Sequence, residues 1–388
     1  MATPSTRHFP RAIAMLVGTI IGVGIFGVPY LVAQSGVRIG LIHFAVLTAV
    51  ILLVHLFFGE IALRTKKHER LVGYASQYLG PTGKRLAAIS AIGGIYGAII
   101  AYITVSGQFL HELLGSLAGG TPWQFSVGFA VIGAIAIAIG MKLVEDLEFV
   151  LTAFLFVAMA LIFVVGGQRI DAENLRTIDW SSGFLPYGAI LFSLGGVSVI
   201  AEIRDTLRGR ERLLPRAIAW GTLLAALVSA LFVVVVVGVS GAATSPESIA
   251  GLAPILGRSI VTLGSVLGFL AIATSFLTLG LYLCEVFELD FHLPKRAAFV
   301  GAIVVPFLIF LIGNPSFTQI ILITGAVFGG IDGVLIAIIV LKARTHGDRK
   351  PEYTVRVPSW VNGVVVLVFL VGIAVTIRDL LVSHGFLS

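Results

Sequence analysis

The stretch GTIIGVGIFGVP, residues 18–29, decides the fold of this chain because it places four glycines and a proline inside a long apolar run. Glycine and proline are the residues that weaken a helix interior most. A helix that crosses hydrocarbon must satisfy its own backbone polar groups, unless the freed groups face protein or a cavity. We therefore predict that the first membrane span is interrupted near its middle, and that the interruption serves a function.

Composition identifies the chain as an integral membrane protein. Apolar residues make up 57% of its 388 residues and charged residues 12%, about half of the roughly 25% that is usual in soluble domains. The apolar runs lack the alternating pattern of a membrane β-barrel, so we predict an all-α bundle in the lipid bilayer. Eleven runs are long enough to cross a hydrocarbon core of roughly 30 Å, at residues 12–34, 39–63, 86–114, 123–141, 147–167, 184–203, 215–240, 259–284, 296–313, 317–341 and 360–382.

The basic residues indicate orientation, because lysine and arginine concentrate in short cytoplasmic loops. Alternate polar segments, starting with the N-terminal tail, hold all of the 26 basic residues except Arg38, Arg169, Arg176, Arg258 and Arg378. We therefore predict a cytoplasmic N-terminus and an extracellular C-terminus, in what we expect to be a bacterial inner (plasma) membrane. The net charge of +6 follows from this loop bias, so we expect no nucleic-acid partner.

The sixth run, PYGAILFSLGGVSVIAEI, is interrupted in the same way by Gly195 and Gly196. This pair follows Gly22 and Gly24 by about 172 residues, and the third and eighth runs start about 173 residues apart. Two glycine-interrupted spans at corresponding positions of two halves are the sequence pointer to an inverted repeat with its binding site at the breaks. The expected units are a first repeat at residues 1–167, a second at 184–341, and an appended helix at 360–382.

A helix interrupted at mid-membrane leaves free amide groups at the start of its second half and free carbonyl groups at the end of its first half. The amides and the local dipole favour a carboxylate, and the carbonyls favour an ammonium group or a metal cation. Glycine lets a ligand approach the bare backbone. A site with both features suits a zwitterion such as an amino acid, without any charged side chain.

The text GTIIGVGIFGVPY resembles the first helix of the amino acid–polyamine–organocation superfamily, which carries a G-x-x-x-G-x-G-[IV]-F-x-x-P pattern. The texts LFSLGGVSVIAEI and ATSFLTLGLYLCEVF are most similar to its amino acid/auxin permease branch and to the hydroxy/aromatic amino acid permeases, relatives of the sodium-coupled neutral amino acid transporters. The resemblance covers runs one to ten. It implies the leucine-transporter (LeuT) type 5+5 fold with discontinuous helices 1 and 6, in which runs 1, 2, 6 and 7 rock as a bundle against a scaffold of the others.

The resemblance also implies where an amino acid binds. The expected amide donors to its carboxylate are Gly22, Val23 and Gly24, and the expected carbonyl acceptors of its amine are Ile20, Phe192 and Ser193. Phe192 also matches an aromatic gate, and Tyr102 or Tyr96 of the third run either contacts the substrate or simply packs. Small residues such as Gly195 leave room for a bulky side chain, which favours an aromatic or large neutral substrate.

In the sodium-coupled relatives one ion lies between the first break and the eighth helix, on oxygen ligands suited to a hard cation. The matching ligands here are the carbonyls of Gly18, Ile21 and Ala271 and the hydroxyls of Thr274 and Ser275. The alternative role of these hydroxyls is a hydrogen bond to a carbonyl one turn back. Proton-driven relatives can place a lysine from the fifth helix in this pocket, and run 147–167 has none. We therefore expect symport with Na+, and no other cofactor.

Asp332, in the text FGGIDGVLIAII of the tenth run, favours a proton instead. A carboxylate near the bilayer centre costs about 2.5–3.5 kcal/mol on insertion scales, so it should face the pathway or carry a proton. His55 and Glu60 are weaker candidates, and Glu60 is close enough to the cytoplasm to extend its carboxylate there. The charged residues that follow the sixth break are expected to form a cytoplasmic gate with the basic loop; they are Glu202, Arg204 and Asp205. Uncoupled exchange stays open as a third possibility.

Other classes of function fit the sequence less well. An intramembrane enzyme needs paired acids, a Ser/His set or metal ligands at membrane depth, and neither H-E-x-x-H nor G-x-S-x-G occurs here. Metal-ion transporters of the same fold carry Asp, Asn and Met ligands at both breaks, and both breaks lack them. A channel or receptor stays possible in principle, and conductance without saturable uptake would support it.

Overall fold

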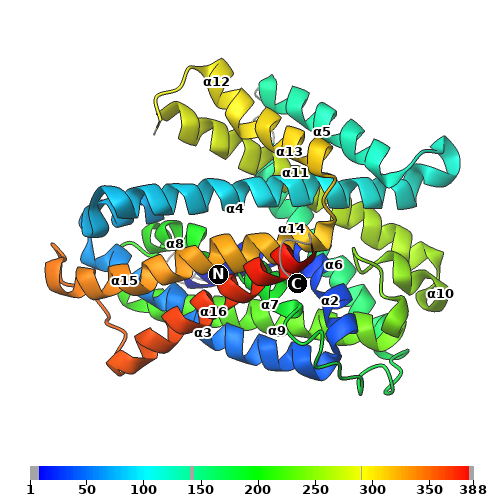
Figure 1. Cartoon of the computed structure of the whole chain (residues 1–388), viewed down its shortest axis with the longest axis horizontal. Helices are drawn as coiled ribbons and strands as arrows, with labels where there is room; N and C mark the ends of the chain where they lie inside the picture. Colours follow the sequence, from blue (N-terminus) through cyan, green and yellow to red (C-terminus); the bar gives the residue numbers. More distant parts are fainter. Residues whose placement is uncertain (1–7, 140–143, 290, 384–388) are drawn as a thin grey trace, which may run out of the picture.

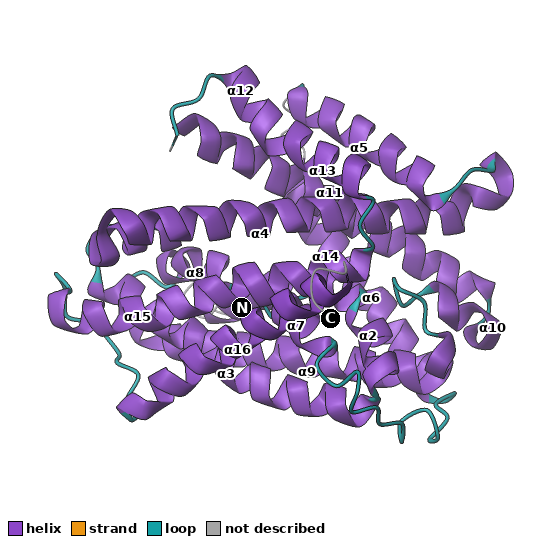
Figure 2. Ribbon diagram, viewed as in Figure 1, coloured by secondary structure: helices purple, strands orange, loops and turns teal. Residues whose placement is uncertain are grey.

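The computed structural model describes residues 8–139, 144–289 and 291–383, and within these ranges the chain consists of helices and loops without a strand (Figure 1, Figure 2). The first part of the chain forms α1 (His8–Ile20), η2 (Val23–Phe26), α2 (Val28–Ser35), α3 (Val37–Arg64), α4 (Leu71–Ala118), α5 (Pro122–Ala138), α6 (Val144–Gly167), α7 (Pro186–Ser193), η3 (Val197–Val199) and α8 (Ile200–Thr206). The second part forms η4 (Glu211–Leu213), α9 (Leu214–Ser240), η5 (Gly241–Ala243), η6 (Ala250–Leu252), α10 (Ala253–Leu256), α11 (Arg258–Leu289), α12 (Lys295–Phe299), η7 (Val300–Val304), α13 (Val305–Gly313), α14 (Phe317–Ile323), η8 (Thr324–Gly329), α15 (Gly330–His346) and α16 (Ser359–Ser383). The expected all-α class is confirmed.

Most of the expected spans are long and apolar enough to cross a membrane. Eight helical segments of the described chain are long and apolar enough to cross a membrane, and the bent pair of α1 with η2–α2 makes a ninth. Each of the eleven apolar runs contains helix. Helix α5 has 17 residues and ends before its run does, and α6 has 24 residues, of which the described side chains cover Leu155–Gly167. Length and composition therefore show eight or nine spans among the described residues, and the count of eleven stays a prediction.

The first span is broken where its glycines predict. Helix α1 ends at Ile20, and Gly22 has an extended backbone with φ −118° and ψ −154°. The chain then forms the short 3-10 helix η2, and α2 begins with Pro29 in its first turn, the position at which proline suits a helix start. The two halves of the span meet at an angle of 49°.

The sixth span is broken as well. Helix α7 ends at Ser193, the next three residues are not helical, and the span resumes through η3 into α8. Gly196, which precedes η3, has φ −152° and ψ 8°, outside the helical region. The expectation that helices 1 and 6 are discontinuous is therefore confirmed at both positions.

Two features of the later spans do not follow from the hydrophobic pattern. The ninth span contains the π-helical segment η7, and the tenth contains the π-helical segment η8. Such segments widen a helix locally and occur often at functional sites. A π-helical segment of a membrane span is built from apolar residues, as an α-helical segment is. The apolar sequence of these runs therefore does not predict η7 or η8.

The helices pack as two groups, which contact each other through the tenth span and through α6, since α6 packs on α9 as well as on α11. In one group α3, α1 and α2 pack on α9, and α7 and α8 pack on α3; in the other group α4, α6 and α5 surround α11. The segments of the tenth span, α14, η8 and α15, pack on α4 and belong to the second group, and they contact α7 and α3 of the first group. Figure 1 shows α4 running across the molecule between α5, α11 and α13 on one side and α15, α16 and α3 on the other.

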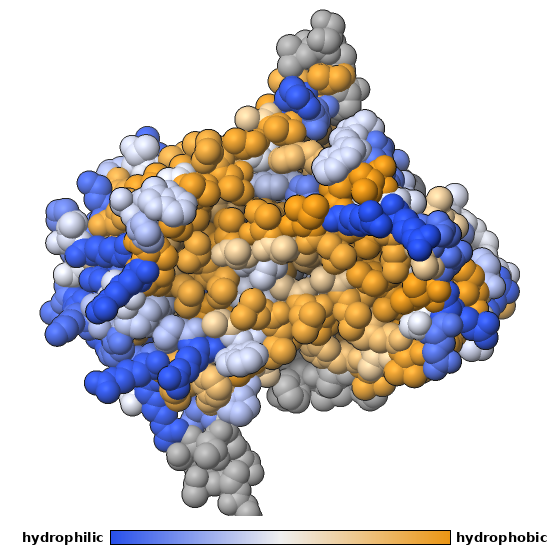
Figure 3. All heavy atoms as spheres, turned by 90° about the horizontal axis from the view of Figure 1, so that it is seen from below, coloured by the Kyte–Doolittle hydropathy of each residue, from blue (hydrophilic) through white to orange (hydrophobic). Residues whose placement is uncertain are grey.

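The surface agrees with a membrane setting. In Figure 3 a band of apolar side chains crosses the middle of the visible face, and hydrophilic side chains gather at both ends of the molecule. Large apolar side chains such as Ile132, Leu227 and Ile312 are exposed at 70%, 66% and 86%. A soluble protein rarely exposes a continuous apolar area of this kind.

Candidate functional site

The two breaks, far apart in sequence, lie against each other. The 3-10 helix η2 packs on α7. A β-carbon built on Gly24 would lie 2.8 Å from Cδ1 of Phe192 and 2.9 Å from the Cα atom of Ser193. Gly24 and Ser193 are both buried. The structure therefore brings together the residues of both breaks that the sequence singled out, and only a glycine fits at this contact.

The end of α1 leaves backbone groups free of ordinary helical bonding. The last α-helical bond runs from the amide of Ile21 to the carbonyl of Val17, at 2.9 Å. The amide of Gly22 donates to the carbonyl of Ile20 at 3.0 Å, and not to the carbonyl of Gly18 four residues back. The Gly18 carbonyl is thus one of the helix-end carbonyls that need a partner from outside the helix.

The amides that follow this break also lack partners within their helix. The first bond of η2 runs from the amide of Ile25 to the carbonyl of Gly22, at 3.3 Å. The amides of Val23 and Gly24 precede it, and the first amides of a helix have no partner within the helix. Two of the three expected carboxylate donors therefore lie at a helix start, where an anion is favoured.

The hydrogen bonds at the sixth break stay within the sixth span. The amide of Leu194 donates to the carbonyl of Ile190 at 2.9 Å, and the amide of Gly195 donates to the carbonyl of Phe192 at 3.3 Å. The Ser193 hydroxyl also donates to the carbonyl of Ile190, at 3.0 Å. The Ser193 side chain therefore bonds to its own helix, and Gly195 beside it is exposed.

A cluster of phenylalanine rings closes one side of the breaks, the side expected to face outward. The ring of Phe26 lies edge-on to Phe109 of α4 at 5.3 Å and to Phe232 of α9 at 6.2 Å, and all three are buried. The carbonyl of Phe26 accepts a hydrogen bond of 2.5 Å from the hydroxyl of Ser248, which is buried in the loop between α9 and α11 and has φ 69°. Sequence reasoning placed the aromatic gate at Phe192 only, because nothing in the text links three distant phenylalanines.

The two tyrosines of the third run have different surroundings. The Tyr96 hydroxyl donates to the carbonyl of Gly301 in η7 at 2.5 Å, so this side chain binds the ninth span, as the packing alternative predicts. Tyr102 is half-buried on α4.

The five expected ligands of the sodium ion lie on the two different helix groups. The hydroxyl of Thr274 donates to the carbonyl of Ala271 at 2.9 Å, and both residues are buried. This is the bond to the preceding turn that was the alternative role of Thr274. Ser275 is half-buried beside it on α11. Gly18 and Ile21 belong to the segment that packs on α9 and α8, while α11 packs mainly on α4, α6 and α5.

Acidic ligand sets are missing from the part of the chain that the structure describes: it contains no group of three or more His, Cys, Asp or Glu side chains that could hold a metal ion. A cation at the site would therefore depend on carbonyl and hydroxyl oxygens, which are the ligands that hard cations accept.

Asp332 lies in the first turn of α15, directly after η8. Its Oδ1 atom is buried and has no hydrogen-bond partner. The neighbouring hydroxyl of Ser90, on α4, donates to the carbonyl of Phe328 at 2.7 Å. A buried carboxylate oxygen without a donor is costly in its charged form. Asp332 is therefore an acid inside a membrane span, with one oxygen that no donor of the protein satisfies.

The other polar candidates are buried in pairs or lie at the cytoplasmic end. His55 is fully buried, with its Nδ1 atom 2.9 Å from the hydroxyl of Thr222 on α9. Arg204 is buried and Glu202 is exposed, while Asp205 forms an ion pair of 2.9 Å with His68 of the loop after α3. Asp205 thus contacts the loop after α3, and the cytoplasmic gate stays a prediction.

Glu60 differs from its expected position. Its side chain is 0% exposed and forms ion pairs with Arg64 and Arg344. The expectation that it extends to the cytoplasm is wrong, because two arginines reach the carboxylate inside the protein and supply the charge that water would otherwise screen.

A family model matches most of the chain. The model of the tryptophan/tyrosine permease family matches residues 6–379. Tyrosine-specific transport systems 1 and 2 of Haemophilus influenzae are each 25% identical to this chain, with 96% of both chains covered in each comparison. The crystal structure of MhsT in complex with L-phenylalanine has a TM-score of 0.62 and 17% identity, covering 95% of this chain and 99% of that chain. The fold is therefore that of MhsT, the LeuT fold.

Proposed function

The chain belongs to the tryptophan/tyrosine permease family, and from this premise we propose that it is a secondary active transporter of aromatic amino acids that works by alternating access. As a permease it is a transporter and not an enzyme. The names of the two tyrosine-specific relatives support the substrate class. The observation that carries the proposal is the contact of the two broken spans at Gly24 and Ser193.

The amino acid would bind across this contact. Its carboxylate would accept hydrogen bonds from the amides of Gly22, Val23 and Gly24, where the start of η2 favours an anion. Its ammonium group would donate to the carbonyls of Ile20, Phe192 and Ser193. The Ile20 carbonyl accepts one backbone bond already, from the amide of Gly22, and a carbonyl oxygen has a second lone pair for such a donor.

The substrate side chain would lie beside the sixth break. Phe192 offers a ring face, and aromatic rings attract each other in edge-on or offset arrangements. Gly195 has no side chain to occupy the space next to it, and it is exposed. Tyr102 of α4 is the side chain of the other helix group that we assign to this pocket.

The architecture that fits this role has two inverted repeats, at residues 1–167 and 184–341, with the helix of residues 360–382 appended. The breaks at residues 21–22 and 194–196 occupy corresponding places in these repeats, which supports the division. The distribution of basic residues supports a cytoplasmic N-terminus and an extracellular C-terminus, in a bacterial inner membrane.

Sodium is the coupling ion that we propose first. Its ligands would be the carbonyls of Gly18, Ile21 and Ala271 and the hydroxyls of Thr274 and Ser275. The 2.9 Å bond from Thr274 to Ala271 supports this choice because it places two of these oxygens side by side. The free Gly18 carbonyl at the end of α1 supplies a further oxygen on the facing group.

A proton is the second candidate, and the buried Oδ1 atom of Asp332 favours it. An acid at this depth would take up a proton on one side of the membrane and release it on the other. In that case the protein is a proton-coupled permease, or an exchanger whose cycle does not depend on a cation gradient.

Uptake by the purified protein in proteoliposomes tests these proposals. A panel of unlabelled amino acids competes with labelled tyrosine, first under a sodium gradient and then under a pH gradient. Competition by aromatic amino acids with saturation supports the proposed function, and stimulation by one gradient identifies the coupling ion. Steady conductance without saturable uptake would replace the transporter by a channel, and binding without uptake would indicate a receptor.

A further inference from the structure

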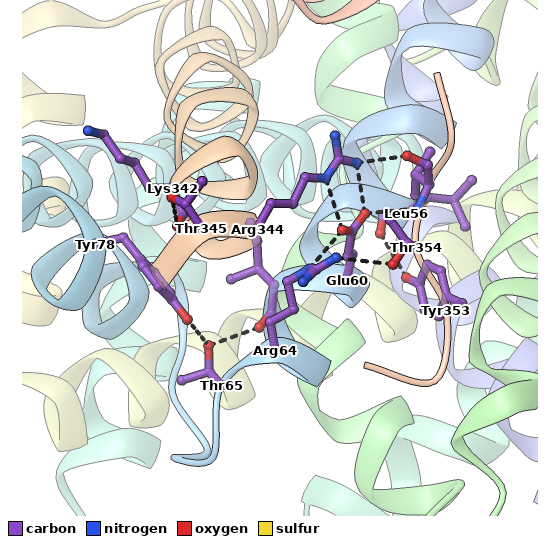
Figure 4. A network of polar contacts seen from close by, with 12 residues as sticks. Leu56, Glu60, Arg64, Thr65, Tyr78, Lys342, Arg344, Thr345, Tyr353 and Thr354 are labelled. Atoms are coloured by element: carbon purple, nitrogen blue, oxygen red, sulfur yellow. Dashed lines mark hydrogen bonds and ion pairs between the residues drawn. The ribbon is translucent and has the colours of Figure 1, made fainter. Parts of the chain in front are cut away.

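A buried carboxylate joins the two helix groups at the end expected to face the cytoplasm (Figure 4). Oε1 of Glu60, on α3, accepts hydrogen bonds from Nε of Arg64 at 2.8 Å and from Nε of Arg344 at 3.0 Å. Oε2 accepts from Nη2 of Arg344 at 2.9 Å and from the amide of Val355 at 2.9 Å. Arg344 lies on α15, so its two parallel bonds to the carboxylate cross from one group to the other.

The loop between α15 and α16, residues 347–358, lies on the same end of α3; we call it the strap. The amides of Asp348 and Arg349 both donate to the carbonyl of Arg64 at 3.1 Å, and Nη1 of Arg349 donates to the carbonyl of Leu63 at 3.1 Å. These carbonyls belong to the last turn of α3, which has no partners of its own and attracts positive charge. The strap therefore caps α3.

The strap also reaches along α3 toward α9. The hydroxyl of Tyr353 donates to the carbonyl of Leu56 at 2.7 Å. A β-carbon on Gly59 would lie 2.3 Å from this hydroxyl oxygen and 2.8 Å from Cδ1 of Ile218 on α9. Burial, together with the nearby Glu60 carboxylate, raises the pKa of Tyr353 well above its usual value, so its hydroxyl keeps the proton that it donates.

The contact between the two groups continues from the strap toward the breaks. A β-carbon on Gly325 of η8 would lie 1.9 Å from the carbonyl oxygen of Gly188 on α7, and one on Gly188 would lie 2.2 Å from the carbonyl oxygen of Leu322. Here two backbones touch without side chains between them. The tenth span is thus in close contact with the bundle helices α3 and α7 at two levels of the membrane.

The opposite side of the bundle is built differently. The half-spans α1 and α8 pack on each other and on α9 and α3. Ser198 and Glu202, on the segment that leads into and through α8, are exposed, and so is Gly195 at the break. The bundle therefore contacts the tenth span along one edge and contacts α6 through α9 along another, and its segment from η3 to α8 is partly exposed.

We propose that the edge formed by α3 and α7 against α15 and η8 is the axis about which the bundle turns during transport, and that Glu60 and the strap clamp this axis closed. This inference rests on the proposed function, because it assigns a part to the transport cycle. Separating α3 from α15 would leave the buried Glu60 carboxylate with Arg64 as its only ion-pair partner and would take both of its bonds from Arg344 away, and a buried charge that loses a partner is strongly unfavourable. We therefore expect the contacts between α3 and α15 to stay formed while other parts of the bundle move.

A reversible tether across the clamp tests the axis. A β-carbon on Gly347 would lie 3.2 Å from Cβ of Arg64 and 2.6 Å from the carbonyl oxygen of Ala343, so a small shift of the chain at residue 347 both relieves the close approach and brings the pair to the usual separation in a disulfide. The test protein carries Arg64→Cys and Gly347→Cys, with Cys284→Ser to remove the native thiol. Each single cysteine variant is the matched control, and thiol titration measures the extent of tethering.

If this edge is the axis, the oxidised protein and the same protein reduced with dithiothreitol should take up substrate at equal rates. Loss of uptake on oxidation, restored by the reductant, would overturn it, because the edge would then have to open in each cycle. Uptake by the Cys284→Ser parent tests the proposed function separately from the axis.

A second variant pair keeps the inference testable if the tethered protein does not fold. Glu60→Gln removes the charge of the clamp, and the matched variant Glu352→Gln removes a partly exposed charge of the same strap. We expect Glu60→Gln to lower the maximal uptake rate per folded protein by about tenfold, which corresponds to about 1.4 kcal/mol in the barrier, with KM unchanged. A Glu60→Gln protein that folds and transports at the rate of Glu352→Gln would overturn the clamp.

Discussion

Gly24 and Ser193 touch backbone to backbone: a β-carbon on Gly24 would lie 2.9 Å from the Cα atom of Ser193. The two residues are 169 positions apart in the sequence, and each lies at a break in a membrane span. Their contact brings the free amides of the first break next to the carbonyls of the sixth. The substrate site that we propose depends on this one relationship, and the first prediction tests it.

Replacing Gly24 with alanine should disrupt the contact, because the added methyl group would also lie 2.8 Å from the ring of Phe192. Overpacking of this kind costs about 1–3 kcal/mol, so we expect a lower unfolding temperature and loss of uptake. Gly22→Ala is the matched control, since the nearest atom to its new methyl group would be 3.8 Å away. Equal stability of the two variants would contradict the contact.

Thr274→Val tests the sodium assignment. Valine has the shape of threonine without the hydroxyl, so a cation site that uses this oxygen loses one ligand. We expect stimulation of uptake by sodium to disappear in this variant, measured in proteoliposomes over a series of sodium concentrations. Ser265→Ala, at another buried hydroxyl of α11, should keep the stimulation. An unaltered sodium dependence in Thr274→Val would remove Thr274 from the ligand set.

Asp332→Asn separates the two coupling ions. Asparagine fills the same volume and has no proton to exchange, so uptake driven by a pH gradient should be abolished if Asp332 is the proton carrier. Under sodium coupling the same variant should retain its response to a sodium gradient. Ser90→Ala is the control for a mere packing effect, because Ser90 bonds to the carbonyl of Phe328 beside the acid. Full pH-driven uptake by Asp332→Asn would exclude the proton role.

Ser248→Ala should weaken the contact between Phe26 and the loop that holds residue 248. The variant leaves the carbonyl of Phe26 without its 2.5 Å hydrogen bond, and a buried unsatisfied group costs about 1–3 kcal/mol. Weaker closure shifts the population toward states that accept external substrate, so we expect a lower KM for uptake. Ser181→Ala, at an exposed serine in another loop, should leave KM unchanged. A KM in Ser248→Ala equal to that of the parent would show that this bond does not hold the loop.

Glu60→Ala should destabilise the protein strongly, since it leaves Arg64 and Arg344 facing an empty place in the interior. Breaking a buried ion pair in this way costs about 3–5 kcal/mol, which denaturant unfolding in detergent will measure. Asp379→Ala is the comparison, because its ion pair with Arg378 is 52% and 66% exposed and such pairs contribute about 0–1 kcal/mol. Similar losses of unfolding free energy in both variants would contradict the buried ion pairs of Glu60 with Arg64 and Arg344.

Local features of the sequence predicted the breaks well. Gly22 and Pro29 mark the end of one half-span and the start of the next, and Gly195 and Gly196 mark the sixth break. Such residues act through the conformational preference of their own backbone, which needs no knowledge of the rest of the chain. The positions of the helices followed from apolar length for the same reason, although α5 ends before its run does.

Contacts between distant residues were not predictable in this way. The ring cluster of Phe26, Phe109 and Phe232 joins three spans, and the chain contains 26 phenylalanines from which any set might have been chosen. Glu60 was expected to reach the cytoplasm because its partner Arg344 lies 284 residues further along. Tyr96 and Tyr102 could not be told apart until Gly301 was placed beside Tyr96.

The sequence by itself determined that this protein lies in a membrane, that its spans are helical, and that two of them are broken at glycines, since hydropathy and backbone preference are properties of a short stretch of chain. The tertiary structure alone decided that the breaks meet at Gly24 and Ser193, that Phe26 closes one side, and that Glu60 binds Arg344. These depend on which helix faces cross each other, and in lipid that choice is made by close packing and polar pairing between distant segments.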